Sequence, residues 1–313
     1  MIGFFLFLSL CSIGWAAEKE TIVFADAGWD SIRFHNAVAQ FIVEEGYDYP
    51  TDVISGSTPA TLLGLQEGDI DVEMEVWTGN WGDAYYGPLE EGLFKELSVN
   101  FDDNAQGLYV PTFVIEGDAE RGIEPLAPDL KSWKDLEKYW EVFQDEEDPA
   151  KGRIYGSPPG WKVDEVLRNA IKEHNMDKYF NYFSPGSDSA LSAAIVAAYE
   201  RGEPIVAYYW EPTWVMGKLN MTLLEGIDGE QPLSCGMEVM ITVNSQLPEK
   251  APEVAEFLSH YRTSSQLTSE ALAYMMESDA DTEEAAEWFL KNSPDVWTKW
   301  VSDEIAQKVL EAL

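Results

Sequence analysis

The sequence predicts an α/β fold built on parallel strands. Near the N-terminus, a strand–helix–strand–helix–strand order fits within fewer than 60 residues. That order is typical of parallel strands joined by right-handed crossovers. The middle of the chain repeats the alternation of strands and helices. The length of 313 residues corresponds to about two domains at roughly 100–200 residues each.

The first unit begins with a strand over 21–25, followed by a turn and a helix with apolar residues at helical spacing. A short strand over 51–54 leads to a second helix that begins near Ser57. Residues 69–76 alternate strictly between apolar and acidic side chains, which predicts a third strand with one buried and one solvated face.

The second unit has weaker signals, and the C-terminal part is almost wholly helical from Pro248. The patterns predict strands over 109–115, 153–156, 205–209 and 239–243, and helices over 134–143, 163–174 and 188–202. No stretch after the N-terminus approaches the ~20 apolar residues of a membrane helix.

Charge is the unusual feature of the composition. The chain carries 20 basic and 57 acidic residues, a net charge of −37. Such a chain repels nucleic acid and anionic membranes, since phosphate binding needs clustered Lys and Arg. We therefore expect no nucleic-acid or membrane-surface partner. We interpret the acidity as adaptation of the whole surface to a saline medium.

The N-terminus predicts export. Ile2 to Leu10 form a short apolar run, and small residues follow it, so residues 1–17 are expected to be a cleaved signal peptide and the mature chain to be periplasmic. A lipid anchor at Cys11 is not expected, because Leu10 is too large for the position before it. After cleavage only Cys235 remains, which excludes an intrachain disulfide and favours a small buried side chain.

Tryptophans gather where strands are predicted to end. Trp29, Trp77, Trp161 and Trp210 each end or follow a strand, and Tyr109, at the start of its strand, is expected to join them. Ligands of open α/β sheets bind at these carboxyl ends. Rings facing one cleft would recognise a quaternary ammonium, which has no N–H donor for hydrogen bonds. The remaining tryptophans divide into two that stay ambiguous, Trp81 and Trp214, and five assigned to packing: Trp133, Trp140, Trp288, Trp297 and Trp300.

Four segments, taken in order, resemble the substrate-binding proteins of ABC importers for glycine betaine, proline betaine and choline. They are Asp26–Ser31 (Asp-Ala-Gly-Trp-Asp-Ser), Gly68–Val72 leading to Trp77, Ser157–Trp161 (Ser-Pro-Pro-Gly-Trp) and Tyr209–Pro212 (Tyr-Trp-Glu-Pro). The resemblance implies a periplasmic-binding-protein fold of two α/β lobes that close over ligand, with an ABC permease and its ATPase as partners. It places residues 18–111 and 229–313 in lobe 1 and residues 112–228 in lobe 2.

The resemblance also implies site residues. Trp29, Trp77, Tyr109, Trp161 and Trp210 match positions used for aromatic cages in one branch or another of the family. The choline-type branch has an acid where this chain has Ser31, with Asp30 one residue early, and a polar residue at the position of Trp161. Both departures favour a betaine over choline, and the sulfonium zwitterion dimethylsulfoniopropionate stays possible.

A betaine also needs a site for its carboxylate. Trp161, Lys162 and Val163 are expected to open a helix, whose free N–H groups and positive dipole end suit an anion. The family resemblance implies the same use of these amides. The side chain of Lys162 is the other candidate for this role.

Two other classes of function compete with this interpretation. A secreted, Trp-rich, acidic chain could be a glycoside hydrolase, for which paired carboxylates do the chemistry. The obvious acids, however, are expected on the solvated strand face: Asp69, Asp71, Glu73 and Glu75. A purely structural protein would leave the strand-end tryptophans unexplained. The sequence shows no catalytic motif, metal-ligand spacing or cofactor motif, so we expect a monomeric, non-enzymatic receptor.

Overall fold

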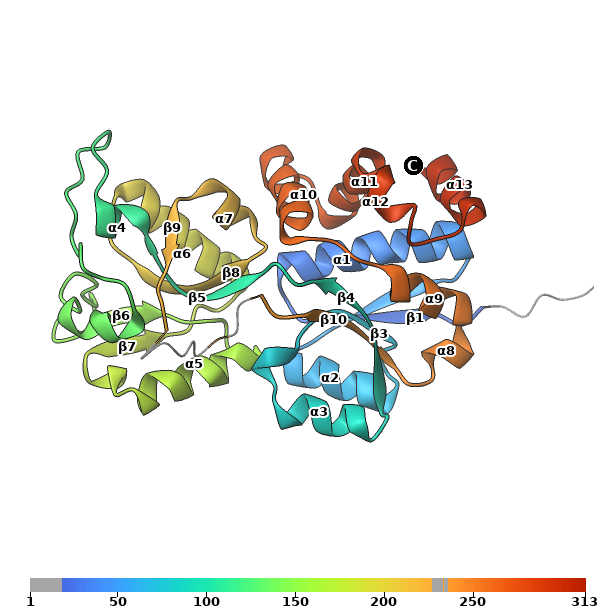
Figure 1. Cartoon of the computed structure of the whole chain (residues 1–313), viewed down its shortest axis with the longest axis horizontal. Helices are drawn as coiled ribbons and strands as arrows, with labels where there is room; N and C mark the ends of the chain where they lie inside the picture. The colour runs from blue at the N-terminus through green and yellow to red at the C-terminus, as the bar shows by residue number, and fades with distance from the viewer. Residues whose placement is uncertain (1–18, 227–232, 234–235) are drawn as a thin grey trace, which may run out of the picture.

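Two five-stranded sheets organise the chain in the computed structural model (Figure 1), which describes residues 19–226, 233 and 236–313. The spatial order of the strands in the first sheet is β2 (Thr51–Ser55), β1 (Ile22–Asp26), β3 (Val72–Trp77), β10 (Val239–Asn244) and β4 (Phe94–Phe101). In this sheet the first three strands are parallel, and β10 runs antiparallel to both of its neighbours, β3 and β4. The expected parallel arrangement of the first three strands is confirmed.

Helices cover both faces of the first sheet, with α1 and the C-terminal helices on one side and α2 and α3 on the other (Figure 1). They are α1 (Asp30–Phe41, continued by a π-helical turn over Ile42–Gly46), α2 (Thr58–Glu67), α3 (Asp83–Glu90), α8 (Leu247–Lys250), α9 (Pro252–His260), α10 (Ser265–Ser278), α11 (Thr282–Asn292), α12 (Pro294–Trp297) and α13 (Asp303–Ala312). A single-turn 3₁₀ helix, Thr78–Asn80, follows β3. We call this sheet with its helices the first lobe.

The second sheet is also mixed, with β6 parallel to β7 and β8, and β5 antiparallel to β8 and β9. Its order is β7 (Phe180–Phe183), β6 (Gly152–Tyr155), β8 (Val206–Glu211), β5 (Ala105–Pro111) and β9 (Met221–Leu223). The helices are α4 (Thr112–Glu116), α5 (Lys162–Glu173), α6 (Asp188–Arg201) and α7 (Trp214–Lys218), with 3₁₀ turns at Trp133–Lys138 and Met176–Lys178. This sheet and these helices form the second lobe.

Several elements differ from the sequence-based expectation. The strand expected over 109–115 ends at Pro111, and Thr112–Glu116 is helical. The helix expected over 134–143 is only a 3₁₀ turn that ends at Lys138. Because β5 pairs with β8 and β9, the chain passes to the second sheet before residue 105, earlier than the expected lobe boundary at 111.

The two connections between the lobes are tied together by Asn104. The first runs from β4 to β5, and the second returns from β9 to β10. The Asn104 side chain donates a hydrogen bond to Met237 O at 2.6 Å, and Gly236 N–H donates to Asn104 O at 2.8 Å. The two crossings therefore run side by side at this point.

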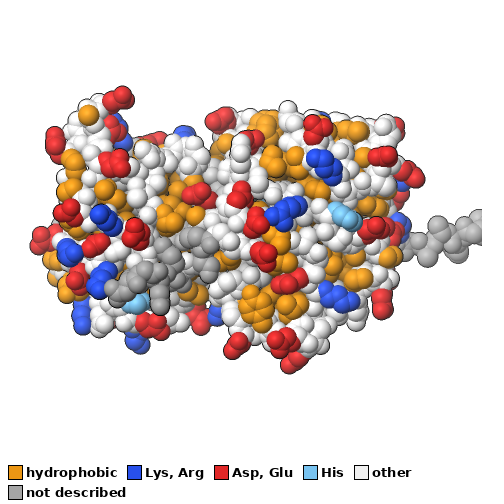
Figure 2. Space-filling view, in the orientation of Figure 1, with side chains coloured by type: hydrophobic (Ala, Val, Ile, Leu, Met, Phe, Trp, Pro, Cys, Tyr) orange, Lys and Arg blue, Asp and Glu red, His pale blue; other side chains and the backbone are white. Residues whose placement is uncertain are grey.

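Charged side chains are dispersed over the surface. Acidic groups lie on both lobes of the face shown in Figure 2, between scattered Lys and Arg. Within the described residues, no helix is long and apolar enough to cross a membrane. The expected signal peptide, Cys11 and Cys235 all lie outside the described residues.

Candidate functional site

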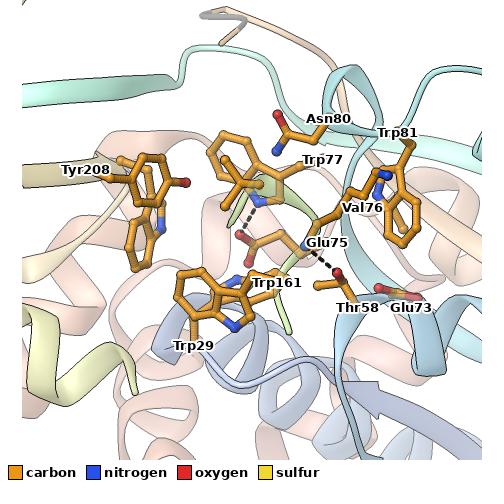
Figure 3. Close-up of a pocket in the computed structure, with 13 residues that line it drawn as sticks. Trp29, Thr58, Glu73, Glu75, Val76, Trp77, Asn80, Trp81, Trp161 and Tyr208 are labelled. Carbon is orange, nitrogen blue, oxygen red and sulfur yellow. Dashed lines mark hydrogen bonds between the residues drawn. The ribbon is translucent and has the colours of Figure 1, made fainter. Parts of the chain in front are cut away.

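Five tryptophans from both lobes line a single pocket between them (Figure 3). Its empty space is about 450 Å³, open mouth included. The lining residues are Trp29, Thr58, Glu73, Glu75, Val76, Trp77, Asn80, Trp81, Trp161, Lys162, Val163, Tyr208 and Trp210. The structure thus brings together all four strand-end tryptophans, along with Lys162 and Val163.

The first lobe supplies Trp29 and Trp77 from the ends of neighbouring strands. Strand β1 ends at Asp26, and Gly28 adopts a φ of 100°, a left-handed conformation that disfavours other residues. This turn places Trp29 at the N-cap of α1. Trp77 is the last residue of β3, and its indole Nε1–H donates to Glu75 Oε1 at 2.9 Å. Both side chains are buried.

The second lobe supplies Trp161, Trp210 and Tyr208. Gly160, with a φ of 95°, precedes Trp161, which caps the N-terminus of α5. Trp210 and Tyr208 lie two residues apart on β8 and therefore share one face of the strand. Their rings stack at 5.8 Å with an interplanar angle of 21°. Tyr208 was missed by the sequence analysis, although the period of two along the strand pointed to it.

The rings meet at nearly right angles. Trp161 lies 5.3 Å from Trp29 at 78° and 5.1 Å from Trp210 at 82°, measured between ring centroids and planes. Perpendicular rings form the corners of a box with differently oriented faces. We call Trp29, Trp77, Trp161, Tyr208 and Trp210 the aromatic cage. Such a cage attracts a methylated cation through the negative faces of its rings.

Two buried acids complete the wall of the pocket. Glu73 is 2% exposed and Glu75 is fully buried. The expectation that Asp71, Glu73 and Glu75 occupy a solvated face is wrong, because β3 is an inner strand covered by helices on both sides of the sheet (Figure 1). Asp69, which precedes the strand, is exposed as expected.

Burial changes the acidity of both groups. Loss of water contact raises the pKa of Glu73 to about 8, against a hydrogen bond from Thr61, and the charge of Glu75 raises it further. Loss of water contact also raises the pKa of Glu75 to about 7, although the side-chain hydrogen bonds from Trp77 and Ser31 oppose the shift. Both carboxyls therefore titrate near neutral pH.

Thr58, Gly160 and Lys162 join the lobes at the edge of the pocket. Lys162 N–H donates to the Thr58 hydroxyl at 2.7 Å, and Thr58 N–H donates to Gly160 O at 3.1 Å. The ammonium group of Lys162 is paired with Glu165 at 2.6 Å. Of the three amides expected to be free for a carboxylate, those of Lys162 and Trp161 are therefore already engaged, the latter with Pro158 O at 3.5 Å, whereas Val163 lines the pocket beside them.

Asp30 and Ser31 lie behind the cage and not in its pocket. They line a smaller neighbouring cavity with Asp188 of α6. Ser31 reaches the pocket only through Glu75, since its hydroxyl donates to Glu75 Oε1 at 3.0 Å.

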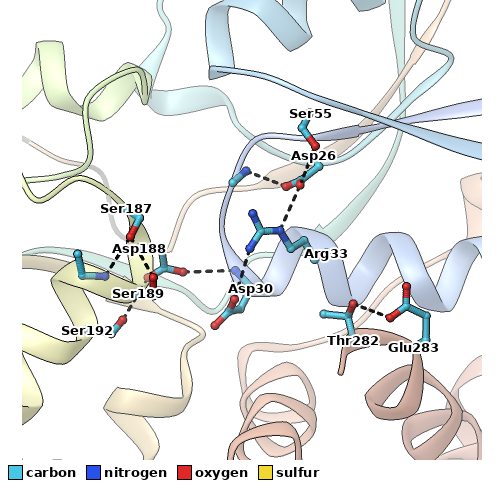
Figure 4. A network of polar contacts seen from close by, with 12 residues as sticks. Asp26, Asp30, Arg33, Ser55, Ser187, Asp188, Ser189, Ser192, Thr282 and Glu283 are labelled. Atoms are coloured by element: carbon cyan, nitrogen blue, oxygen red, sulfur yellow. Dashed lines mark hydrogen bonds and ion pairs between the residues drawn. The ribbon is translucent and has the colours of Figure 1, made fainter. Parts of the chain in front are cut away.

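A polar network around Asp30 also spans the two lobes (Figure 4). Asp30 N–H donates to Asp188 Oδ2 at 3.4 Å, and Arg33 pairs with Asp26 at 3.1 Å and with Asp30 at 3.8 Å. Burial, together with the charge of Asp30, raises the pKa of Asp188 to about 7. Closure of the lobes therefore brings two carboxyls close together.

Tyr109 is the expected cage residue that the structure does not bring into the pocket. On β5 it lies opposite Ala207, whereas Gln106 lies opposite Trp210. Because side chains alternate along a strand, Tyr109 points to the face of the sheet away from Trp210. Its hydroxyl donates to Glu211 at 3.2 Å.

The two ambiguous tryptophans separate. Trp81 lines the pocket, whereas Trp214 opens α7 and lines the smaller cavity with Asp30. The five assigned to packing are buried or partly buried in the hydrophobic cores, as expected. Trp300, for example, stacks on Tyr261 at 4.2 Å.

A comparison of the sequence with known protein families identifies the family to which this chain belongs. Residues 20–292 match the family OpuAC, the substrate-binding domain of the ABC-type glycine betaine transport system. The chain belongs to this family. Its members are solute-binding receptors of ABC transporters, located outside the cytoplasm. The resemblance stated from the sequence is confirmed.

Individual relatives agree with this assignment. The glycine betaine/carnitine transport binding protein GbuC of Listeria monocytogenes is 26% identical over 147 residues, or 47% of this chain. This chain therefore aligns with about half the length of that relative, or 48% of it.

Among solved structures, an ABC-transporter choline-binding protein in complex with choline has a TM-score of 0.76 and 25% identity. The alignment covers 93% of this chain and 97% of that one. Lactococcal OpuAC, closed with glycine betaine bound, has a TM-score of 0.74 at 17% identity, covering 91% of this chain and all of the other. This member of the OpuAC family therefore has the expected two-lobed fold of periplasmic binding proteins.

Proposed function

We propose that this OpuAC-family chain captures a small quaternary ammonium solute in its aromatic cage and delivers it to an ABC importer. The observation that carries the proposal is the convergence of the four strand-end tryptophans, from both lobes, on one pocket. Each ring face contributes roughly 0.5–2 kcal/mol to cation binding. Several rings together support an affinity near micromolar, about −8 kcal/mol, after the costs of association.

Closure couples to binding because neither lobe holds a complete cage. Trp29 and Trp77 come from the first lobe, and Trp161 and Trp210 from the second. A ligand gains all its ring contacts only when the lobes meet, so it stabilises the closed state by its differential affinity for that state. A closed receptor is the form that we propose docks on the permease outside the cytoplasm.

The cage binds the methylated head group of the ligand, and it does not determine which chemical group the rest of the ligand carries. Glycine betaine is our first candidate, because Ser31 replaces an acid and Trp161 replaces a polar residue of the choline-type branch. Choline and dimethylsulfoniopropionate carry equivalent onium heads. We propose a receptor without catalytic activity.

Calorimetric titration tests this function with glycine betaine, proline betaine, choline, carnitine and dimethylsulfoniopropionate. We expect one-to-one binding of at least one of them. Substitution W210A should weaken that binding by about 1–3 kcal/mol, roughly fivefold to 150-fold, because it removes a wall of the cage. The matched control is W288A in α11, whose ring stacks on Tyr274 far from the pocket.

Two results would overturn the proposal. One is the absence of binding across the whole panel. The other is unchanged affinity in a W210A variant that circular dichroism shows to be folded. Release of reducing sugar from glycosides would instead support the glycoside hydrolase reading, in which buried carboxyls such as Glu73 and Glu75 do the chemistry.

A further inference from the structure

Glu75 presents an unsatisfied oxygen inside a pocket built for a cation. Its Oε1 accepts hydrogen bonds from Ser31 and Trp77, at 3.0 and 2.9 Å. Its Oε2 is buried and accepts no hydrogen bond, although the Trp29 indole N–H, which also lacks a partner, lies close enough to lower the pKa of the carboxyl. The residue is fully buried, lines the pocket, and lies beside Trp77 and Trp161 in Figure 3. A buried polar atom of this kind is expensive unless something pairs with it.

The charged groups around Glu75 do not supply that partner. Two acids face it, Glu73 on β3 and Asp188 on α6. The cations Lys162 and Arg33 are paired with other acids. Tyr261, which follows α9, also interacts with the charge of Glu75. Burial, together with that charge, raises the pKa of Tyr261 well above its ordinary value, so its hydroxyl stays neutral.

We propose that Glu75 selects the ligand by its net charge. When ionised, it pairs with an onium ligand of net charge +1, such as choline. When protonated, its Oε2–H donates a hydrogen bond to the carboxylate of a zwitterion such as glycine betaine. This inference rests on the proposed function and assigns the discrimination to one side chain.

The proton balance of the two binding events is opposite. Binding of choline drives the Glu75 proton into solvent, whereas binding of glycine betaine retains the proton or takes one up. Burial holds the pKa of Glu75 near neutrality, at about 7. The preference between the two ligands therefore changes within the range of pH in which the fold is expected to be stable.

Titration of the wild-type chain with choline and with glycine betaine at pH 6 and pH 8 tests this assignment. A group with a pKa near 7 changes its ionised fraction about tenfold over this interval. Choline affinity should rise by up to about tenfold from pH 6 to pH 8, and glycine betaine affinity should fall by a similar factor. Buffers of different ionisation enthalpy should show proton release with choline only.

Substitution E75Q keeps the shape of the side chain and removes its titration. In this variant both pH trends should disappear, and choline binding at pH 8 should weaken while the amide still donates to glycine betaine. Circular dichroism checks that the E75Q variant is folded. The E73Q variant is the matched control, in which we expect both pH trends to persist because Glu75 still titrates. Opposite trends that persist in E75Q but vanish in E73Q would overturn the assignment.

The same titrations separate this inference from the proposed function. If neither ligand nor any other onium compound binds at either pH, the proposed function fails. If both ligands bind with the same pH dependence in the wild-type chain, the inference about Glu75 fails and the proposed function stands.

Discussion

The hydroxyl of Thr58 in the first lobe accepts a hydrogen bond from Lys162 N–H in the second lobe, at 2.7 Å. The same residue donates its own N–H to Gly160 O at 3.1 Å. Thr58 begins α2, and Lys162 begins α5, so the N-terminal ends of two helices meet at the rim of the pocket. This contact exists only while the lobes are together.

Substitution T58A should therefore destabilise the closed state and speed ligand release. Loss of the hydroxyl removes one interlobe hydrogen bond worth about 1 kcal/mol, which corresponds to a roughly fivefold faster dissociation rate. Stopped-flow tryptophan fluorescence measures this rate. Thr282, a half-buried residue at the start of α11 and remote from the pocket lining, offers the control T282A, for which we expect the wild-type rate. A T58A variant that releases ligand at the wild-type rate would contradict the role of this contact.

Lys250, at the end of α8, and Asp71, directly before β3, form a largely buried ion pair at 2.8 Å. Asp71 also accepts from Val23 N–H at 2.9 Å. Substitution K250M would leave this carboxylate without its charge partner, so we expect the free energy of unfolding to fall by about 2–3 kcal/mol. Urea denaturation measures the loss. K291M, which breaks a half-exposed pair with Glu287, should cost less than about 0.5 kcal/mol. Equal losses in the two variants would be inconsistent with burial as the cause.

Glu73 should make the folded chain less stable as the pH rises. Its pKa of about 8 in the folded state lies above the ordinary value of 4.5, so between these two values the folded state binds more protons than the unfolded state. The free energy of unfolding therefore decreases as pH rises from about 4.5 to 8. Substitution E73Q removes this contribution and should stabilise the chain at pH 8 by at least about 1 kcal/mol relative to its effect at pH 5. Urea denaturation at both values measures the difference, and an effect independent of pH would exclude it.

Salt should stabilise the chain. A net charge of −37 spread over both lobes gives self-repulsion that favours expansion. Screening shortens from about 30 Å at 0.01 M to about 3 Å at 1 M salt, so the repulsion weakens. We expect the thermal midpoint to rise between 0.05 M and 1 M sodium chloride. The same series with choline chloride absent and present separates screening from ligand binding. A midpoint that falls with salt would show that specific ion pairs outweigh the net charge.

The placement of the four strand-end tryptophans was predictable because the carboxyl ends of parallel strands meet at one edge of a sheet. Trp77 at the end of β3 and Trp210 near the end of β8 needed only the correct strand ends. Tyr109 lay beyond this reasoning, since the face it occupies depends on its register with β8. A shift of one residue along β5 reverses the direction of every side chain.

The acids of β3 show a second limit of prediction from the sequence pattern. Alternation correctly places Glu73 and Glu75 on one face of the strand, but it does not say whether that face meets water. Helices from the N-terminal and the C-terminal regions of the chain cover the first sheet and bury this face, and the C-terminal helices are distant in sequence from β3. The Thr58–Lys162 contact was equally out of reach, because it joins residues 104 positions apart through the arrangement of the lobes.

Asn104 fastens the two connecting segments to each other, through Met237 O and Gly236 N–H, at the point where they leave the sheets. Two connecting segments that are hydrogen-bonded to each other at one place favour a hinge motion, in which one lobe rotates against the other about that place. The indoles of the second lobe would then sweep along one arc and return to the same register after each delivery. Precision in recognising a small solute would thus depend on an amide remote from it.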